Sequence, residues 1–196
     1  MPRTSRSGPF CVSQRFLINC GQPSTTGEYN TISNPVIEAI QSRRSCRAFK
    51  SDPVPRELVE QVAEAGLWAA SGMGRQPVKI IAITDKALRD RLADQNRRIG
   101  GWPEGFDPFY GAPVILAIVA DKSAFTAIYD GSLVMGNLLL AAYSLGVGSI
   151  WIHRTKEEFE SEEGKALTTR ASWSIRGTRA TSPRPGSTFS AVARRC

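Results

Sequence analysis

Histidine is nearly absent from this sequence of 196 residues, in which His153 is the single copy. The four cysteines are scattered, and no pair has the spacing of a metal site or a redox motif. A histidine-rich metal centre is therefore excluded, and a histidine-based triad could use only His153. Because scattered cysteines are typical of a reduced protein, the predicted location is the cytoplasm.

Long hydrophobic runs are also missing. The longest apolar stretch, residues 138–147, contains Tyr143 and Ser144 and is much shorter than the roughly 20 residues that cross a bilayer. The N-terminus carries Arg3 and Arg6 but no convincing apolar segment of a secretory signal. The sequence predicts no membrane association.

Acidic residues are almost lacking at the two ends of the chain. Residues 1–33 and 169–196 together hold nine arginines and one glutamate, whereas residues 34–168 hold 16 basic and 17 acidic residues. The net charge of +7 thus belongs to the ends, and the middle is near neutral. Since a nucleic-acid footprint is a basic patch on a folded face, no nucleic-acid partner is predicted. A basic RNA-binding protein that uses its arginine-rich tail is the alternative.

Composition divides the chain into three parts. Residues 1–33 are rich in Ser, Thr, Gly, Pro and Asn and are predicted to be a disordered leader. Residues 34–167 have the periodicity of one folded domain. Residues 168–196 form an atypical tail rich in Arg, Ser and Pro, with no obvious folded element. The abrupt change suggests an altered terminus, a hypothesis that re-reading the coding DNA in its other frames would test.

Apolar periodicity predicts alternating helices and strands within the middle part. Two continuous apolar runs, 78–84 and 114–120, are typical of strands covered on both faces. The predicted helices are 35–44, 55–70, 86–99, 130–145 and 156–167, and a short third strand is predicted over 148–153.

Three segments carry candidate chemistry. The first places Arg43, Arg44 and Arg47 around Ser45, directly after the opening helix. Guanidinium groups offer forked donors that match phosphate oxygens. A solvated basic helix end is the competing interpretation, because cations are favourable at a helix C-terminus.

The second segment contains Ser71, Gly72, Gly74 and Gln76, between a helix and a strand. Small residues let a flat ring approach the main chain. An ordinary connection between a helix and a strand is an equal alternative. The third segment runs through residues 136–148 into Trp151, Ile152 and His153, and on its own it is weak evidence for a cofactor.

Taken in this order, the three segments resemble the nitroreductase family of FMN-dependent oxidoreductases. The R-x-S-x-R/K pattern before an aromatic is matched by Arg43, Ser45, Arg47 and Phe49. The A-P-S-x-x-N-x-Q-P pattern is matched by Ala69, Ser71, Gln76 and Pro77, and the G-N-x-x-L-A-A…L-G-x-G-S-x-W pattern is matched over 136–151. The resemblance covers about residues 34–167.

The resemblance implies an α+β, three-layer fold in which a central mixed sheet is flanked by helices. It implies a homodimer with two FMN molecules at the subunit interface. Arg43, with its neighbour Arg44, and Ser45 would hold the phosphate and ribityl end, and Arg47 would lie near the pyrimidine edge of the flavin. The other implied cofactor contacts come from the second and third segments. The partner's flavin would be reached by Ser71, Gly72, Gly74 and Gln76, and the other ring face would be lined by Trp151, Ile152 and His153.

The activity that the resemblance implies is hydride transfer from NADH or NADPH through FMN to a small-molecule acceptor, such as a nitroaromatic or a quinone. The cofactor carries this chemistry, so no protein acid, base or metal is required. His153 could donate a proton near the substrate, although an exposed histidine at a strand end is the simpler interpretation.

The sequence departs from the family pattern at several points. Ala70 replaces the family's proline, Gly74 replaces its asparagine, and His153 stands where glycine is common. The family's C-terminal strand, G-Y-P turn and late basic residue have no match. A catalytically impaired flavin-binding relative is therefore a second alternative, in which the altered C-terminus weakens FMN binding.

Overall fold

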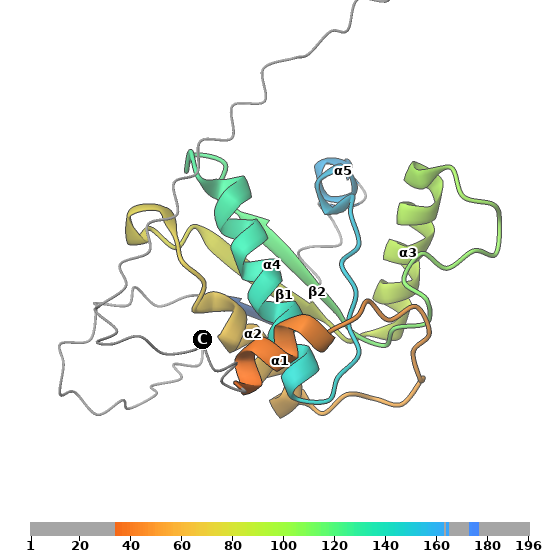
Figure 1. Cartoon of the computed structure of the whole chain (residues 1–196). Coiled ribbons are helices and arrows are strands. Elements are labelled where there is room, and N and C mark those ends of the chain that lie inside the picture. The colour runs from red at the N-terminus through yellow and green to blue at the C-terminus, as the bar shows by residue number, and fades with distance from the viewer. Residues whose placement is uncertain (1–33, 163, 165–172, 177–196) are drawn as a thin grey trace, which may run out of the picture. The chain divides into compact units, whose positions relative to one another are not determined.

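The computed structural model describes residues 34–162, 164 and 173–176. The predicted leader and most of the predicted tail lie outside the described residues. The elements in chain order are α1 (Pro35–Ser42), α2 (Arg56–Leu67), the short 3₁₀ helix η1 (Gly72–Gly74), β1 (Val78–Ile83), α3 (Lys86–Gly100), β2 (Ile115–Ala120), α4 (Ala127–Ser144), α5 (Thr155–Glu160) and β3 (Trp173–Arg176) (Figure 1).

The described strands form one antiparallel sheet with the order β2-β1-β3. β1 pairs along its whole length with β2, from Val78 opposite Ala120 to Ile83 opposite Ile115. On its other side, residues 79–82 of β1 pair with β3. β1 is therefore the central strand, and all but one of its six residues are buried.

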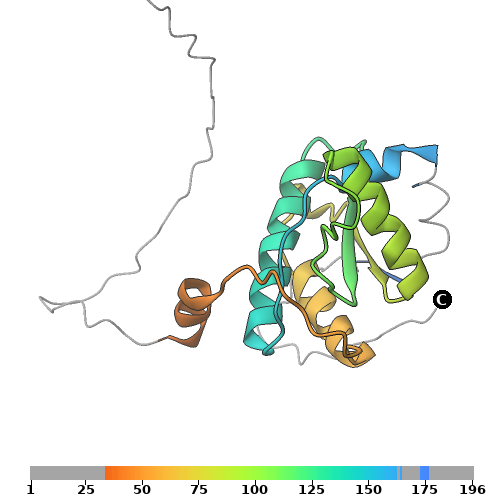
Figure 2. The same cartoon turned by 90° about the vertical axis from the view of Figure 1, so that its right-hand side faces the viewer.

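Alternate residues of the sheet face two separate apolar clusters, because successive strand side chains point to opposite faces. On one face Ile81, Ile83 and Ala117 pack with Leu88 and Leu92 of α3. On the other face Val78 and Ile80 pack with residues of α2 and α4, namely Val62, Ala63, Val134, Leu138 and Ala142. Figure 2 shows α3 and α4 on opposite sides of the strands. The prediction that helices cover both sheet faces is confirmed.

Local sequence explains where the helices begin and end. The side chain of Asn34 accepts hydrogen bonds from the amides of Val36 and Ile37, and Pro35 occupies the first turn of α1. Asp85 caps α3 by accepting from the amide of Leu88. Gly101 ends α3 with a φ of 67°, a left-handed conformation that glycine adopts at little cost.

Close packing of α2 against α4 depends on a glycine. A Cβ atom on Gly66 would lie 2.5 Å from Cδ2 of Leu138 and 3.4 Å from Cδ1 of Ile80. The two helices can therefore approach each other over the sheet because Gly66 has no side chain.

The predicted helices and the first two predicted strands are present, with shifted ends: α4 begins at Ala127 and α5 ends at Glu160. The predicted strand over 148–153 is wrong, since this segment makes one isolated parallel bridge, between Ser149 and Ser45. The sequence also missed β3, which lies inside the segment predicted to have no folded element. None of the helices in the described ranges has the length and apolar character to cross a membrane.

Candidate functional site

The first and third candidate segments lie side by side. The amide of Cys46 donates a hydrogen bond of 3.0 Å to the carbonyl oxygen of Ser149, and Ser45 forms the parallel bridge with Ser149. Gly148 permits this approach, because a Cβ on it would lie 3.3 Å from Sγ of Cys46. The structure thus joins Arg43–Arg47 to the start of the segment that leads to Trp151.

Two of the arginines in the first segment differ in how their donors are used. Arg44 Nη1 donates to the carbonyl oxygens of Gln41, at 2.7 Å, and Arg43, at 2.9 Å, so this guanidinium caps the end of its own helix. Arg43 Nη1 is buried and has no hydrogen-bond partner among the described residues. A buried guanidinium donor without a partner is costly, so Arg43 is the better candidate for binding an anion. Ser45 and Arg47 are exposed beside it.

Residues 151–154 alternate in exposure although they do not form a strand. Trp151 and His153 are exposed, and their rings meet edge to face with centroids 6.1 Å apart. Ile152 is half-buried and packs against the apolar cluster beneath α3. The carbonyl oxygen of His153 accepts a hydrogen bond of 3.2 Å from the side chain of Asn96. A side chain of α3, rather than a neighbouring strand, therefore holds this main chain.

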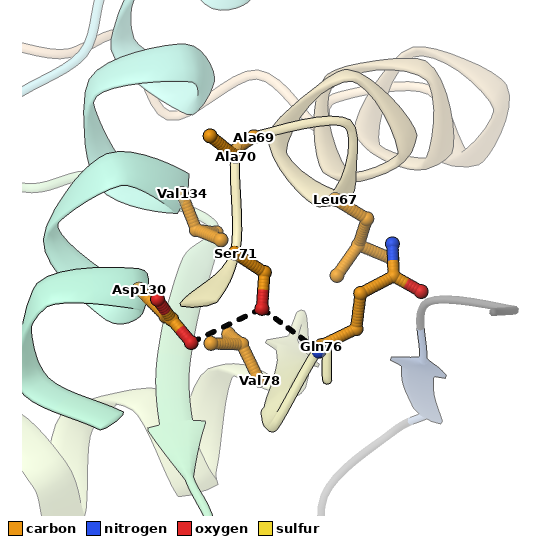
Figure 3. A pocket seen from close by; sticks show the side chains of 8 residues that line it. All are labelled: Leu67, Ala69, Ala70, Ser71, Gln76, Val78, Asp130 and Val134. Atoms are coloured by element: carbon orange, nitrogen blue, oxygen red, sulfur yellow. Dashed lines mark hydrogen bonds between the residues drawn. The ribbon is translucent and has the colours of Figure 1, made fainter. Parts of the chain in front are cut away.

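The second candidate segment is held by Asp130, a carboxylate that is 3% exposed on α4. Its oxygens accept from the amide of Gly72 at 3.0 Å and from the hydroxyls of Ser71 at 3.1 Å and Thr126 at 3.0 Å. The Ser71 hydroxyl oxygen also accepts from the amide of Gln76 at 2.8 Å (Figure 3). The polar groups of Ser71 and Gly72 are thus used within the chain.

Backbone strain accumulates in the same loop. Met73, Gly74 and Gln76 have φ values of 55°, 64° and 47°, and left-handed conformations are uncommon for residues other than glycine. Met73 is 77% exposed, and Arg75 lies over the ring of Phe125, 5.6 Å from its centroid. The Oε1 atom of Gln76 is buried and has no partner within the described part of the chain. Gln76 is one of the residues that line a small hollow, together with Leu67, Ala69, Ala70, Ser71, Val78, Asp130 and Val134 (Figure 3).

The structure does not bring all the candidate residues of one chain together. Arg43, Arg44, Ser45 and Arg47 lie next to the segment that contains Trp151, Ile152 and His153. The loop with Ser71, Gly72, Gly74 and Gln76 lies near the opposite end of β1 in Figure 1.

Sequence reasoning missed three buried polar side chains that support these segments: Asp130, Asn96 and Glu158. Asp130 is the one charged residue of the largely apolar helix α4, which is a signal that the sequence carries. Asn96 is 1% exposed and Glu158 is 5% exposed, and they meet between α3 and α5. The sequence shows both as polar residues on buried helix faces, which is a weaker signal.

The described residues offer no group of acidic, histidine and cysteine side chains that could hold a metal ion. The family model for nitroreductases matches residues 40–100 and 101–165, well over half of the sequence. The chain belongs to the nitroreductase family.

Curated relatives agree with this assignment. The chain is 32% identical over 129 residues to the NADPH-flavin oxidoreductase of Vibrio harveyi, and the match covers 61% of this chain and 53% of the relative. It is 26% identical over 139 residues to the FMN reductase [NAD(P)H] of Bacillus subtilis, with coverage of 60% and 53%. The chain thus spans little more than half the length of these relatives.

Solved structures support the fold. A nitroreductase from Desulfitobacterium hafniense with bound FMN superimposes with a TM-score of 0.66 at 26% identity, over 81% of this chain and 96% of that chain. A nitroreductase from Bacteroides fragilis gives the same TM-score and coverage at 23% identity, which supports the fold alone. The α+β, nitroreductase-like fold implied by the sequence resemblance is confirmed.

Proposed function

We propose that this chain is the FMN-binding part of an NAD(P)H-dependent oxidoreductase that reduces small electron-poor molecules such as nitroaromatics or quinones. Family membership and the FMN-bound solved relatives support the cofactor. The single observation that carries the proposal is the buried Nη1 atom of Arg43, which has no partner among the residues that the structure describes. This arginine lies in a segment that the Ser45–Ser149 bridge joins to Trp151, Ile152 and His153.

The residues present fit the anionic end of FMN. Arg43 has a guanidinium donor that none of the described residues uses, and Ser45 supplies an exposed hydroxyl two residues further along. Guanidinium groups bind phosphate through strong charge-assisted hydrogen bonds. Arg43 and Ser45 would hold the phosphate, while Arg47 would lie at the pyrimidine edge and favour electron-rich forms of the ring.

The other segments would orient the ring system. The main chain at Trp151, Ile152 and His153 would line one ring face. When bound, FMN would take a hydride from NADH or NADPH and reduce a second small molecule in the same site. The strained loop 71–76 would approach from the partner chain. Because the Ser71 hydroxyl and the Gly72 amide already bond to Asp130, this loop would contribute its shape and the side chain of Gln76, whose Oε1 atom no described residue contacts with a hydrogen bond.

A homodimer is part of the proposal because one chain separates the two groups of candidate residues. α1 has no buried residue, and Val36, Ile37 and Ile40 on it are 50–56% exposed. A groove of about 390 Å³ runs between α1, α2 and α4 and is lined by Pro35, Val36, Ala39, Ala65, Asn137, Leu140, Ala141 and Ser144. Exposed apolar area of this kind is typical of a subunit interface.

A titration of purified protein with FMN tests the proposal, with Arg43→Ala as the diagnostic variant. Wild-type protein should quench FMN fluorescence in a saturable way. Arg43→Ala should weaken binding by roughly 10- to 100-fold, since hydrogen bonds to charged groups contribute about 1.5–3 kcal/mol. Lys86→Ala also removes one cation, at an 88% exposed side chain at the start of α3, and should bind FMN like wild type.

Turnover separates the proposal from its alternatives. Consumption of NADH or NADPH with a nitroaromatic acceptor supports an active enzyme, whereas FMN binding without turnover supports the catalytically impaired relative. Absence of FMN binding, together with nucleic-acid affinity that falls steeply with salt, would favour the RNA-binding alternative. The cytoplasmic location and the absence of a nucleic-acid partner stay predictions.

A further inference from the structure

A fully buried amide on α3 connects two parts of the chain that are far apart in sequence. Asn96 Nδ2 donates to the carbonyl oxygen of His153 at 3.2 Å and to the carboxyl group of Glu158. Asn96 is 1% exposed, so solvent does not compete for these bonds. The main chain at His153 and the first turns of α5 are thus tied to one side chain.

The preceding residue adds a second connection. Gln95 Nε2 donates to the carbonyl oxygen of Glu158 at 2.8 Å and to the hydroxyl of Ser161 at 2.6 Å. Two adjacent amides of α3 therefore hold both ends of α5, a helix of six residues. A helix this short has little stability of its own, so these bonds matter for its position.

The charge on Glu158 is unfavourable in this setting. Burial raises the pKa of this carboxyl, the hydrogen bond from Asn96 lowers it, nearby Glu157 raises it and Arg154 lowers it, and the net direction is upward. From α3, the uncharged amide of Asn96 donates to this carboxyl, whereas Gln95 donates to the carbonyl oxygen of the same residue. Arg154 and Glu157 are the charged groups that face it from its own segment.

We propose that Asn96 and Glu158 are positioning residues, which hold the main chain at His153 in the conformation that lines the flavin ring. This inference rests on the proposed function, because it gives residues 151–153 their role in cofactor binding. Neither side chain would touch the cofactor. Their effect passes through the hydrogen bond from Asn96 to the His153 carbonyl oxygen.

The pairing has a consequence for pH. Because the pKa of Glu158 is raised in the folded protein, the neutral carboxyl fits the buried position better than the charged one. As pH rises through this pKa, the charged carboxylate weakens the cluster and loosens residues 151–154. FMN binding should therefore weaken as pH rises, in addition to any titration of FMN itself.

The test compares wild type with Glu158→Gln, Glu158→Ala and Asn96→Ala. Gln keeps an oxygen that can accept from Asn96 but cannot ionise. The FMN dissociation constant is measured from pH 5 to 8 for each protein. Relative to Glu158→Gln, the dissociation constant of wild type should rise several-fold with pH, and Glu158→Ala and Asn96→Ala should bind roughly tenfold more weakly than Glu158→Gln. Glu64→Gln, an exposed site on α2, should keep the wild-type pH profile.

A second measurement needs no flavin. Amide hydrogen exchange of residues 151–160 in flavin-free protein should speed up with pH in wild type more than in Glu158→Gln, beyond the intrinsic pH effect, and should be fastest in Asn96→Ala. If FMN binds neither wild type nor any variant but the exchange pattern appears, the proposed function fails. The coupling of Asn96 and Glu158 to residues 151–154 then still stands. If exchange and FMN affinity in Glu158→Gln follow the wild-type pH profile, the positioning role is wrong.

Discussion

The two faces of the sheet differ in how their buried polar side chains are hydrogen-bonded. On the α2 and α4 face, one buried carboxylate, Asp130, lies beside Val78 and Val134 of the apolar cluster and accepts three hydrogen bonds, from Ser71, Gly72 and Thr126. On the α3 and α5 face, buried polar side chains are more numerous, and Gln95 Oε1 has no partner among the described residues. On the first face, Asp130 holds the loop 71–76 by accepting hydrogen bonds from it. On the second face, residues 151–154 are held by hydrogen bonds that depend on the charge of Glu158.

The largest expected effect is on the apolar side of this comparison. Leu138 is 4% exposed and packs against Gly66 and Ile80. Leu138→Ala should lower the free energy of unfolding by about 2–5 kcal/mol, because it removes buried apolar contacts and leaves a cavity. Ile99→Ala, at a side chain that is 41% exposed, should cost less than about 1.5 kcal/mol in the same urea titration. Equal losses at the two positions would contradict the packing of α4 on the sheet.

The second-largest loss of stability is expected from removing the Asp130 carboxylate on the α2 and α4 face. Asp130→Ala leaves the Gly72 amide and two hydroxyls without their acceptor, which should cost about 2–3 kcal/mol. It should also free the strained loop, so that trypsin cuts faster after Arg75. Asp130→Asn keeps one acceptor oxygen and should lie between wild type and the alanine variant. Resistance of Asp130→Ala to trypsin at Arg75 would show that Asp130 does not hold the loop.

The α3 face has an ion pair whose loss should be milder. Arg89 donates to Asp107 at 2.5 Å and to the carbonyl oxygen of Ala112 at 3.0 Å, holding the loop between α3 and β2. Burial alone would raise the pKa of Asp107, but hydrogen bonds from Arg89 and the amides of Phe109 and Gly111 bring this pKa below the ordinary value of an aspartate.

A carboxyl with a lowered pKa stabilises the fold at neutral pH, and that stability is lost as pH falls through the folded-state value. Arg89→Met should therefore cost about 1–2 kcal/mol at pH 7 and move the acid-unfolding midpoint to higher pH. Lys86→Ala, which removes an exposed partner of Asp90, should leave the midpoint nearly unchanged. An unchanged acid transition in Arg89→Met would contradict the role of this pair.

The smallest effect on stability is expected at Glu158, where the pH dependence of stability has the opposite sign to that at Asp107. Its raised pKa means that the neutral form is favoured in the folded state, so its contribution to stability declines as pH rises through that value. Glu158→Gln should be slightly more stable than wild type at pH 8, by less than about 1 kcal/mol, with the difference vanishing in acid. Thermal unfolding at the two pH values measures it, and a loss of stability at pH 8 would show that the charged form is the one the fold prefers.

Much of the fold could be predicted because short sequence patterns determine most of its helices and strands. The apolar runs at β1 and β2 predicted the strands and their two covered faces. Asn34 and Asp85 are of residue types that favour helix starts, and both cap helices in the structure. β3 could not be predicted, because Trp173–Arg176 lies in a segment of Arg, Ser and Thr and is a strand only through its pairing with β1. The segment 148–153 has strand-like composition, yet the Asn96 side chain occupies the His153 carbonyl oxygen.

The sequence could predict which residues form the candidate site from their side-chain types, but not which residues they contact. The chemistry of Arg43 and Ser45 follows from their side chains, whereas their contact with Ser149 depends on tertiary structure. Arg44 resembled Arg43 in sequence, and only the structure shows that its guanidinium is used on its own helix. The supporting roles of Asp130, Asn96 and Glu158 likewise need contacts between residues roughly 60 positions apart, which no short pattern encodes.

The most direct test of the account is the ratio of the dissociation constants for riboflavin and FMN, which differ by the phosphate. We predict that wild-type protein binds FMN more tightly than riboflavin and that Arg43→Ala loses most of this preference while its affinity for riboflavin stays close to that of wild type. Equal binding of the two flavins by wild type, or an unchanged preference in Arg43→Ala, would contradict the claim that this segment binds the phosphate.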